Sequence, residues 1–158
     1  EDMSTADHIA ALNTIGWDNA EKLHKEKIAF KDGMYGNDET AFYESLEEYK
    51  DLADFCFWRV IELDMGNAEA YAGLAYNVLS YGELTVNIWE YCNIAIGLDQ
   101  NCARAWAIRA YVNSALGKEQ DAAADRAKAL ELSPNAGILI NDGGLPAVKI
   151  RSGEMGRT

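Results

Sequence analysis

Residues 103–135 constrain the fold of this chain more than any other stretch, because bulky, small and turn-forming residues fall there at helical intervals. Trp106 and Ala110 are four residues apart, the spacing at which two side chains share one face of a helix. Gly117 marks a turn and Pro134 marks a stop. The inner face of the second helix is expected to carry Ala122, Ala129 and Leu130. The stretch therefore predicts two short helices joined by a tight turn.

This order of residues resembles the tetratricopeptide repeat (TPR) family, whose repeating unit is a pair of helices. Residues 68–102 resemble a second unit, with Tyr71 in its first helix and Gly82 at its turn. The resemblance covers two to three repeats over residues 58–135. It implies an all-α fold, a right-handed α-α superhelix of the TPR-like solenoid type, in a single domain over residues 1–135.

Three polar residues depart from the family pattern within residues 103–135. Arg109 and Asn113 stand where large apolar residues are usual, and Arg126 replaces the usual aromatic residue. Either the apolar packing between the two helices is sparser here than in the family, or these side chains face a neighbouring group or solvent.

The segments before residue 68 have helical periodicity without clear repeat signatures. Residues 39–63 carry apolar residues at alternating steps of four and three. This stripe consists of Phe42, Leu46, Tyr49, Ala53, Cys56, Val60 and Leu63, and it is widened by Phe55, Phe57, Trp58 and Ile61. With a similar segment at 5–31, it predicts an antiparallel helical hairpin over residues 5–64. Degenerate repeats, broken near Gly16 and near residues 48–50, are the alternative.

The C-terminal segment differs from the rest of the chain. Residues 136–158 are predicted to form a short strand-like, non-helical tail, with strands near 137–140 and 145–150 joined by a turn at 141–144. An isolated hairpin is marginal in water, so the tail is expected to lean on the helical body, on another copy or on a further domain.

The net charge of −12 narrows the classes of partner. Residues 1–66 hold 16 acidic and 6 basic residues, so the acidity is concentrated in the N-terminal half. An acidic surface repels phosphate backbones and anionic lipids, which argues against nucleic acid and membrane partners. No apolar run reaches membrane-spanning length. The three cysteines match no zinc pattern and are expected to be free and buried, which favours a cytoplasmic address.

Motifs for catalysis and for cofactors are weak in this sequence. His8 and His24 lie on opposite faces of one predicted helix, so they are not a catalytic pair. The acids of residues 32–38 do not follow the calcium-loop template, because Gly33 and Met34 occupy positions where oxygen ligands would be needed. We therefore expect no enzyme activity, no cofactor and no metal site.

The first helices of the two units predict a groove for a partner. Superposing the units on Tyr71 and Trp106 places Tyr76 opposite Tyr111 on the concave side. The groove is expected to be lined by Glu69, Ala72, Tyr76, Ser80, Arg104, Ala107 and Tyr111. Tyrosine suits such a role, since it offers a large contact area at low entropic cost. The competing interpretation has both tyrosines packed against the tail or between units.

These features favour a non-enzymatic protein–protein interaction module that binds a basic or amphipathic segment of another protein in the concave groove. One alternative is a TPR-type chaperone for a secreted or membrane-active client. A second alternative is a self-assembling scaffold, a homo-oligomer in which the tail of one copy completes the next.

Overall fold

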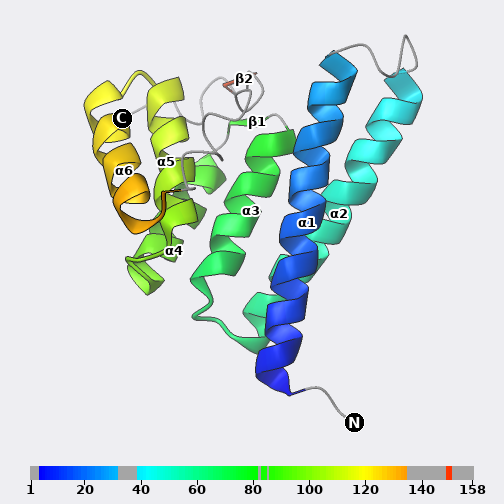
Figure 1. Cartoon of the computed structure of the whole chain (residues 1–158). Coiled ribbons are helices and arrows are strands. Elements are labelled where there is room, and N and C mark those ends of the chain that lie inside the picture. The colour runs from blue at the N-terminus through cyan, green and yellow to red at the C-terminus, as the bar shows by residue number, and fades with distance from the viewer. Residues whose placement is uncertain (1–3, 32–38, 82, 85, 135–148, 151–158) are drawn as a thin grey trace.

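The computed structural model describes residues 4–31, 39–81, 83–84, 86–134 and 149–150 (Figure 1). Apart from one pair of two-residue strands, every regular element among them is a helix, which confirms the predicted all-α class. The elements in chain order are α1 (Thr5–Lys31), α2 (Glu39–Leu63), α3 (Ala68–Tyr81), β1 (Glu83–Leu84), α4 (Val86–Leu98), α5 (Ala103–Ala115), α6 (Glu119–Leu132) and β2 (Lys149–Ile150).

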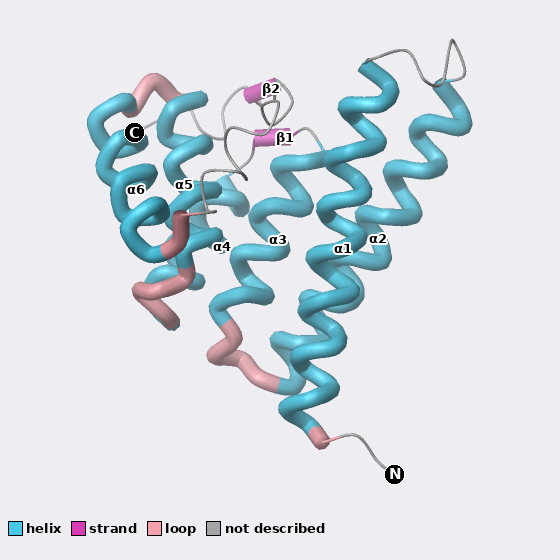
Figure 2. The backbone as a smooth tube through the Cα atoms, in the orientation of Figure 1, coloured by secondary structure: helices cyan, strands magenta, loops and turns pink. Residues whose placement is uncertain are grey.

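The helices pack as successive pairs, α1 with α2, α3 with α4 and α5 with α6 (Figure 2). The first members of the pairs also touch, because α3 contacts both α1 and α5. Helix α1 runs through Gly16 without a break, and α2 runs through residues 48–50. The two long helices therefore have the arrangement that the helical-hairpin interpretation expects.

Local hydrogen bonding and backbone conformation explain where α1 begins and where α5 ends. The Ser4 hydroxyl oxygen accepts a hydrogen bond of 3.1 Å from the Asp7 amide and so caps the start of α1. Gly117, at a φ of 78°, ends α5 in the left-handed conformation that suits glycine. The Lys118 amide then donates to the Asn113 carbonyl at 2.8 Å, closing the Schellman motif. The turn predicted at Gly117 is confirmed.

Phe57 of α2 is the centre of the core. Its side chain is fully buried, and it lies between Gly16 of α1 and Gly73 of α3. Trp17 meets the Phe57 ring edge-on, with 5.7 Å between the ring centroids. Because neither glycine has a side chain, α1 and α3 can both approach the ring closely.

The predicted stripe of α2 is largely confirmed, with two exceptions at its edge. The buried residues of this helix are Phe42, Leu46, Ala53, Cys56, Phe57, Val60 and Ile61. Phe55 and Trp58 are exposed, so the prediction that they widen the buried stripe is wrong. Leu130 of α6 is likewise exposed, contrary to the prediction that it lines an inner face. In α2 the reason is that α1 and α3 cover only part of the helix circumference.

Two of the three polar residues that depart from the repeat pattern in residues 103–135, Arg109 and Asn113, face a neighbouring helix. The Arg109 guanidinium donates to both carboxylate oxygens of Asp125 on α6, at 2.8 and 2.9 Å. The Asn113 amide donates to the same carboxylate at 2.9 Å. Hydrogen bonding to Asp125 raises the pKa of Arg109. A polar network thus joins α5 to α6 where the family pattern would place apolar residues.

The tail touches the helical body at one described place. Lys149 and Ile150 pair with Glu83 and Leu84 as parallel strands β2 and β1. The predicted strand at 137–140 and the turn at 141–144 lie outside the described residues, so the predicted hairpin stays a prediction.

Candidate partner-binding cleft

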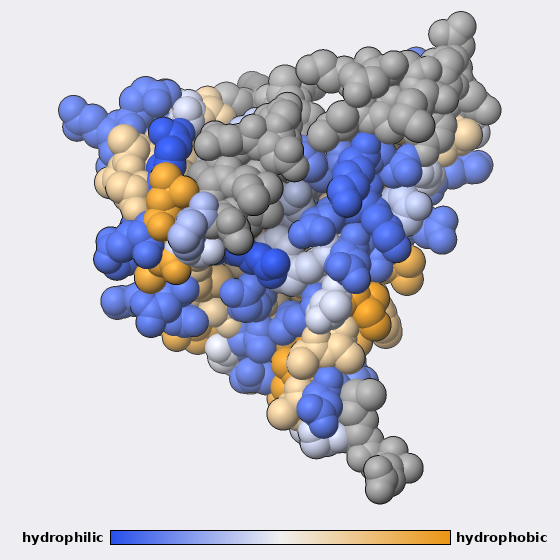
Figure 3. Space-filling model, in the orientation of Figure 1, coloured by the Kyte–Doolittle hydropathy of each residue, from blue (hydrophilic) through white to orange (hydrophobic). Residues whose placement is uncertain are grey.

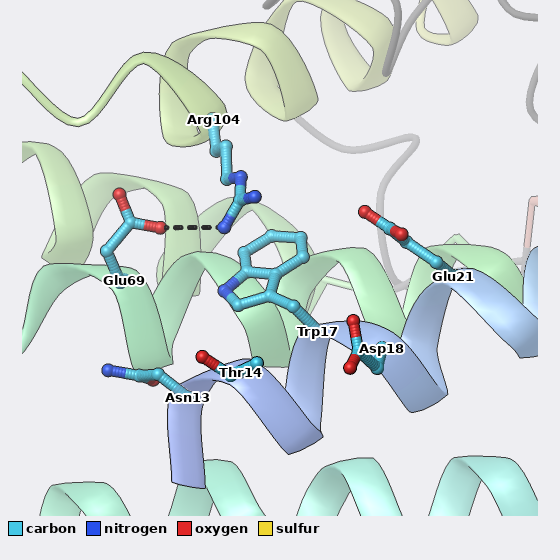
Figure 4. A pocket seen from close by; sticks show the side chains of 7 residues that line it. All are labelled: Asn13, Thr14, Trp17, Asp18, Glu21, Glu69 and Arg104. Atoms are coloured by element: carbon cyan, nitrogen blue, oxygen red, sulfur yellow. Dashed lines mark hydrogen bonds and ion pairs between the residues drawn. The ribbon is translucent and has the colours of Figure 1, made fainter. Parts of the chain in front are cut away.

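A cleft of about 250 Å³ opens where α1 meets the first turns of α3 and α5 (Figure 4). Seven residues line it: Asn13, Thr14, Trp17, Asp18, Glu21, Glu69 and Arg104. Five of them come from α1, so this helix supplies most of the wall. The two residues that α3 and α5 contribute, Glu69 and Arg104, belong to the set predicted to line a groove.

Trp17 forms the apolar part of the cleft. Its indole is buried against Phe57 and against Tyr76, whose ring centroid lies 5.5 Å away. The Arg104 guanidinium carbon lies 4.1 Å from the centroid of the Trp17 ring, within the range of a cation–π contact. Figure 4 shows the guanidinium above the indole, between Glu69 and the α1 carboxylates.

A half-exposed ion pair lies beside the indole. Arg104 Nη1 donates to Glu69 Oε2 at 3.3 Å, and the other Glu69 oxygen lies 3.6 Å from the Cys102 sulfur. Burial, with a contribution from Glu69, raises the pKa of the Cys102 thiol to about 12, so the thiol stays protonated and donates to the carboxylate. Glu69 is therefore held from two sides at the mouth of the cleft.

The rim of the cleft is acidic. Asp18 is exposed and Glu21 is half-buried, one turn apart on α1. With Glu69 they make three carboxylates against the one guanidinium of Arg104, a formal charge of −2. Figure 3 shows hydrophilic residues over this face of α1. A cation or a basic side chain is the complement of such a site.

The structure brings together only part of the predicted groove. Of the predicted groove residues, Glu69 and Arg104 line this cleft. Tyr76 is only 2% exposed, because Trp17 and His24 of α1 pack over its ring, so the prediction that it faces an open groove is wrong. The remaining predicted positions on these helices are buried or half-buried: Ala72, Ser80, Ala107 and Tyr111.

Sequence reasoning missed the contribution of α1 to the cleft. Trp17 follows Gly16, and the pair was compatible with a turn between two shorter helices. Read as one helix, residues 5–31 place Trp17 beside the buried positions Gly16 and Ala20. An aromatic residue next to a helix-interior glycine was the available signal for a close helix contact.

The other candidate groups lie away from the cleft or in the core. Cys56, Cys92 and Cys102 are free and buried, as predicted. His8 is exposed, whereas His24 is buried against Tyr76. Over the described ranges, no cluster of three His, Cys, Asp or Glu side chains is arranged to hold a metal ion, and the acidic loop at 32–38 lies outside those ranges. None of the described helices is long and apolar enough to cross a lipid bilayer.

Comparison with known proteins adds no relative. No protein-family model matches the sequence, no curated protein matches it, and no solved structure matches the fold.

Proposed function

We propose that this protein is a non-enzymatic interaction module that binds a basic segment of another protein in the cleft between α1, α3 and α5. The observation that carries the proposal is the acidic rim around an apolar floor. Asp18, Glu21 and Glu69 surround the Trp17–Arg104 stack within one cleft. A lysine or arginine of the partner would neutralise one of the two excess negative charges, while its methylene groups lie along the apolar wall.

The arrangement of the helices supports the same role. Three helix pairs packed side by side resemble the TPR plan that the sequence pattern implies, in which the first helices of each pair line the binding surface. In this proposal α1, α3 and α5 take the role of those first helices, since all three contribute residues to the cleft. The difference from the predicted groove is that α1 fills the space over Tyr76, so the partner meets α1 instead of the tyrosines.

The polar groups of the cleft suit binding better than turnover. The Arg104 guanidinium is already paired with Glu69, and the Thr14 hydroxyl donates to the Ala10 carbonyl at 3.0 Å. Asp18 is an exposed carboxylate and Glu21 a half-buried one, and both can hold a cation at the mouth of the cleft.

A selection experiment tests the proposal. Random dodecapeptides displayed on phage are selected against the wild-type protein, and one enriched peptide is synthesised. We expect the enriched peptides to be rich in lysine and arginine. The synthetic peptide should bind about three- to tenfold more weakly to Asp18→Asn/Glu21→Gln, since each exposed ion pair contributes about 0.2–1 kcal/mol.

The matched control removes the same charge from α2, where Glu47 and Glu48 are exposed. Glu47→Gln/Glu48→Gln should bind the peptide like the wild type. Enrichment without basic residues, or equal weakening in both variants, would contradict the proposed site.

A further inference from the structure

A second surface of this protein is apolar and exposed. It consists of the exposed Phe55 and Trp58 on α2 and of the exposed Ile94 and Leu98 and the half-buried Tyr91 on α4, and we call it the outer apolar face. The exposed fractions of Phe55 and Trp58 are 67% and 45%, and those of Ile94 and Leu98 are 42% and 44%. Large apolar side chains gathered at this exposure are uncommon on a monomer that has no partner.

The five side chains form one continuous surface. Phe55 and Trp58 are three residues apart on α2, so they are neighbours on the helix. Tyr91 and Ile94 are three residues apart on α4, and Leu98 follows after four more. Trp58 and Tyr91 connect the two helices, because their rings meet edge-on with centroids 6.2 Å apart.

Carboxylates frame the outer apolar face. Those that lie four residues from one of its members along α2 or α4 are Asp51, Asp54, Glu62 and Glu90. Lys50 pairs with Asp54 at 3.0 Å and Arg59 pairs with Glu62 at 2.8 Å. The Lys50 ammonium also interacts with the Asp51 carboxylate, so the two cations leave the four carboxylates with a formal excess of two negative charges. Burial and the nearby charges of Asp54 and Glu90 raise the pKa of Tyr91, so these two carboxylates act on a member of the outer apolar face.

We propose that the outer apolar face binds a basic amphipathic helix of another protein, at a site separate from the cleft. Such a helix offers an apolar stripe flanked by lysine and arginine, which matches an apolar centre with an acidic frame. A second copy of this chain fits poorly, because two identical faces would bring two regions of excess negative charge together. Anionic lipid fits poorly for the same electrostatic reason.

The probe is a designed, fluorescein-labelled peptide of leucine and lysine, about eighteen residues long, with its leucines at helical spacing. A scrambled peptide of the same composition lacks the apolar stripe, and a leucine–glutamate version has the opposite charge. Fluorescence anisotropy at about 0.15 M salt limits purely electrostatic attraction. We expect the Leu/Lys helix to bind at least tenfold more tightly than either comparison peptide.

The variant Phe55→Ser/Ile94→Ser removes one exposed anchor from each helix and should weaken binding at least tenfold. Leu130→Ser is its matched control, because Leu130 is 43% exposed but lies on α6, and it should bind like the wild type. Circular dichroism and melting curves confirm that each variant is folded. Asp18→Asn/Glu21→Gln, which alters only the cleft, should keep its affinity for the Leu/Lys helix.

Five results would overturn this inference. The scrambled peptide could bind as tightly as the helix, or the Phe55→Ser/Ile94→Ser variant could bind unchanged. Loss of binding only in Asp18→Asn/Glu21→Gln would assign the peptide to the cleft, leaving the proposed function standing without a second site. A wild-type dimer that Phe55→Ser/Ile94→Ser dissociates, measured by sedimentation, would assign the face to a second copy of this chain. Binding to lipid vesicles that is lost in the same variant would assign the face to lipid.

Discussion

Replacing Gly73 with alanine should expose how closely α3 approaches the Phe57 ring. A Cβ at Gly73 would come within 2.6 Å of Phe57 Cε2 and would lie closer still to Cε1 and Cζ. The ring cannot swing away freely, because Gly16 of α1 confines its other side, where an added Cβ would also meet the ring at 2.7 Å. The helices must therefore separate or the ring must leave its rotamer.

The magnitude follows from two opposing effects. Overpacking a well-filled core costs about 1–3 kcal/mol, and contacts with three ring atoms place Gly73→Ala at the upper end. Alanine regains about 1 kcal/mol through its higher helix propensity. The free energy of unfolding should therefore fall by about 2 kcal/mol, which lowers the melting temperature by about 4–8 °C for a chain of this length.

Gly97 provides the matched control, because it lies within α4 and a Cβ there would meet nothing within 4 Å. Gly97→Ala should raise the free energy of unfolding by about 0.5–1 kcal/mol. Urea denaturation followed by circular dichroism measures both variants. Shrinking the ring with Phe57→Leu should cost less in the Gly73→Ala background than in the wild type. Equal stability of the two alanine variants would refute the close approach of α3 to the ring.

Three further predictions concern α6 and the cysteines. Asp125→Ala should lower the free energy of unfolding by about 3 kcal/mol in urea titrations, because Arg109 and Asn113 lose their shared acceptor. The control Asp121→Ala, on the exposed side of α6, should lower it by only about 0.5 kcal/mol. Equal losses in the two variants would contradict the polar network. All three cysteines should react with a thiol reagent far more slowly in the native than in the urea-unfolded protein, and rapid native labelling would contradict their burial. The pKa of Cys102 is about 12 when folded and near 9.0 when unfolded, so its contribution to stability is complete below pH 9 and declines as the pH rises toward 12. Cys102→Ala should therefore show a shallower loss of stability between about pH 9 and 11, by up to about 1.4 kcal/mol per pH unit, and an unchanged slope would count against the raised pKa.

Local sequence signals predicted the elements well. Gly117 and Pro134 delimit α6, and the alternating steps of residues 39–63 identify the buried side of α2. These signals succeed because turn chemistry and helical periodicity act over a few residues.

Contacts between distant segments were not predictable in the same way. Matching the repeats placed Tyr76 on the side away from the second helices, but whether that side is open depends on α1, nearly sixty residues earlier in the chain. Periodicity likewise could not separate Phe57, which fits between two glycines of other helices, from its exposed neighbours Phe55 and Trp58. The cleft was missed for this reason, since most of its wall belongs to α1.

Binding of a basic segment between α1, α3 and α5 can be observed at individual residues. The most direct measurement is a nuclear magnetic resonance titration of isotope-labelled protein with the lysine- or arginine-bearing peptide recovered by phage selection. We expect the largest shifts on the Trp17 indole, the Arg104 side chain and the Thr14 and Glu21 amides, with little change in α6. Shifts confined to other surfaces, with the Trp17 and Arg104 signals unmoved at saturation, would contradict binding in the cleft.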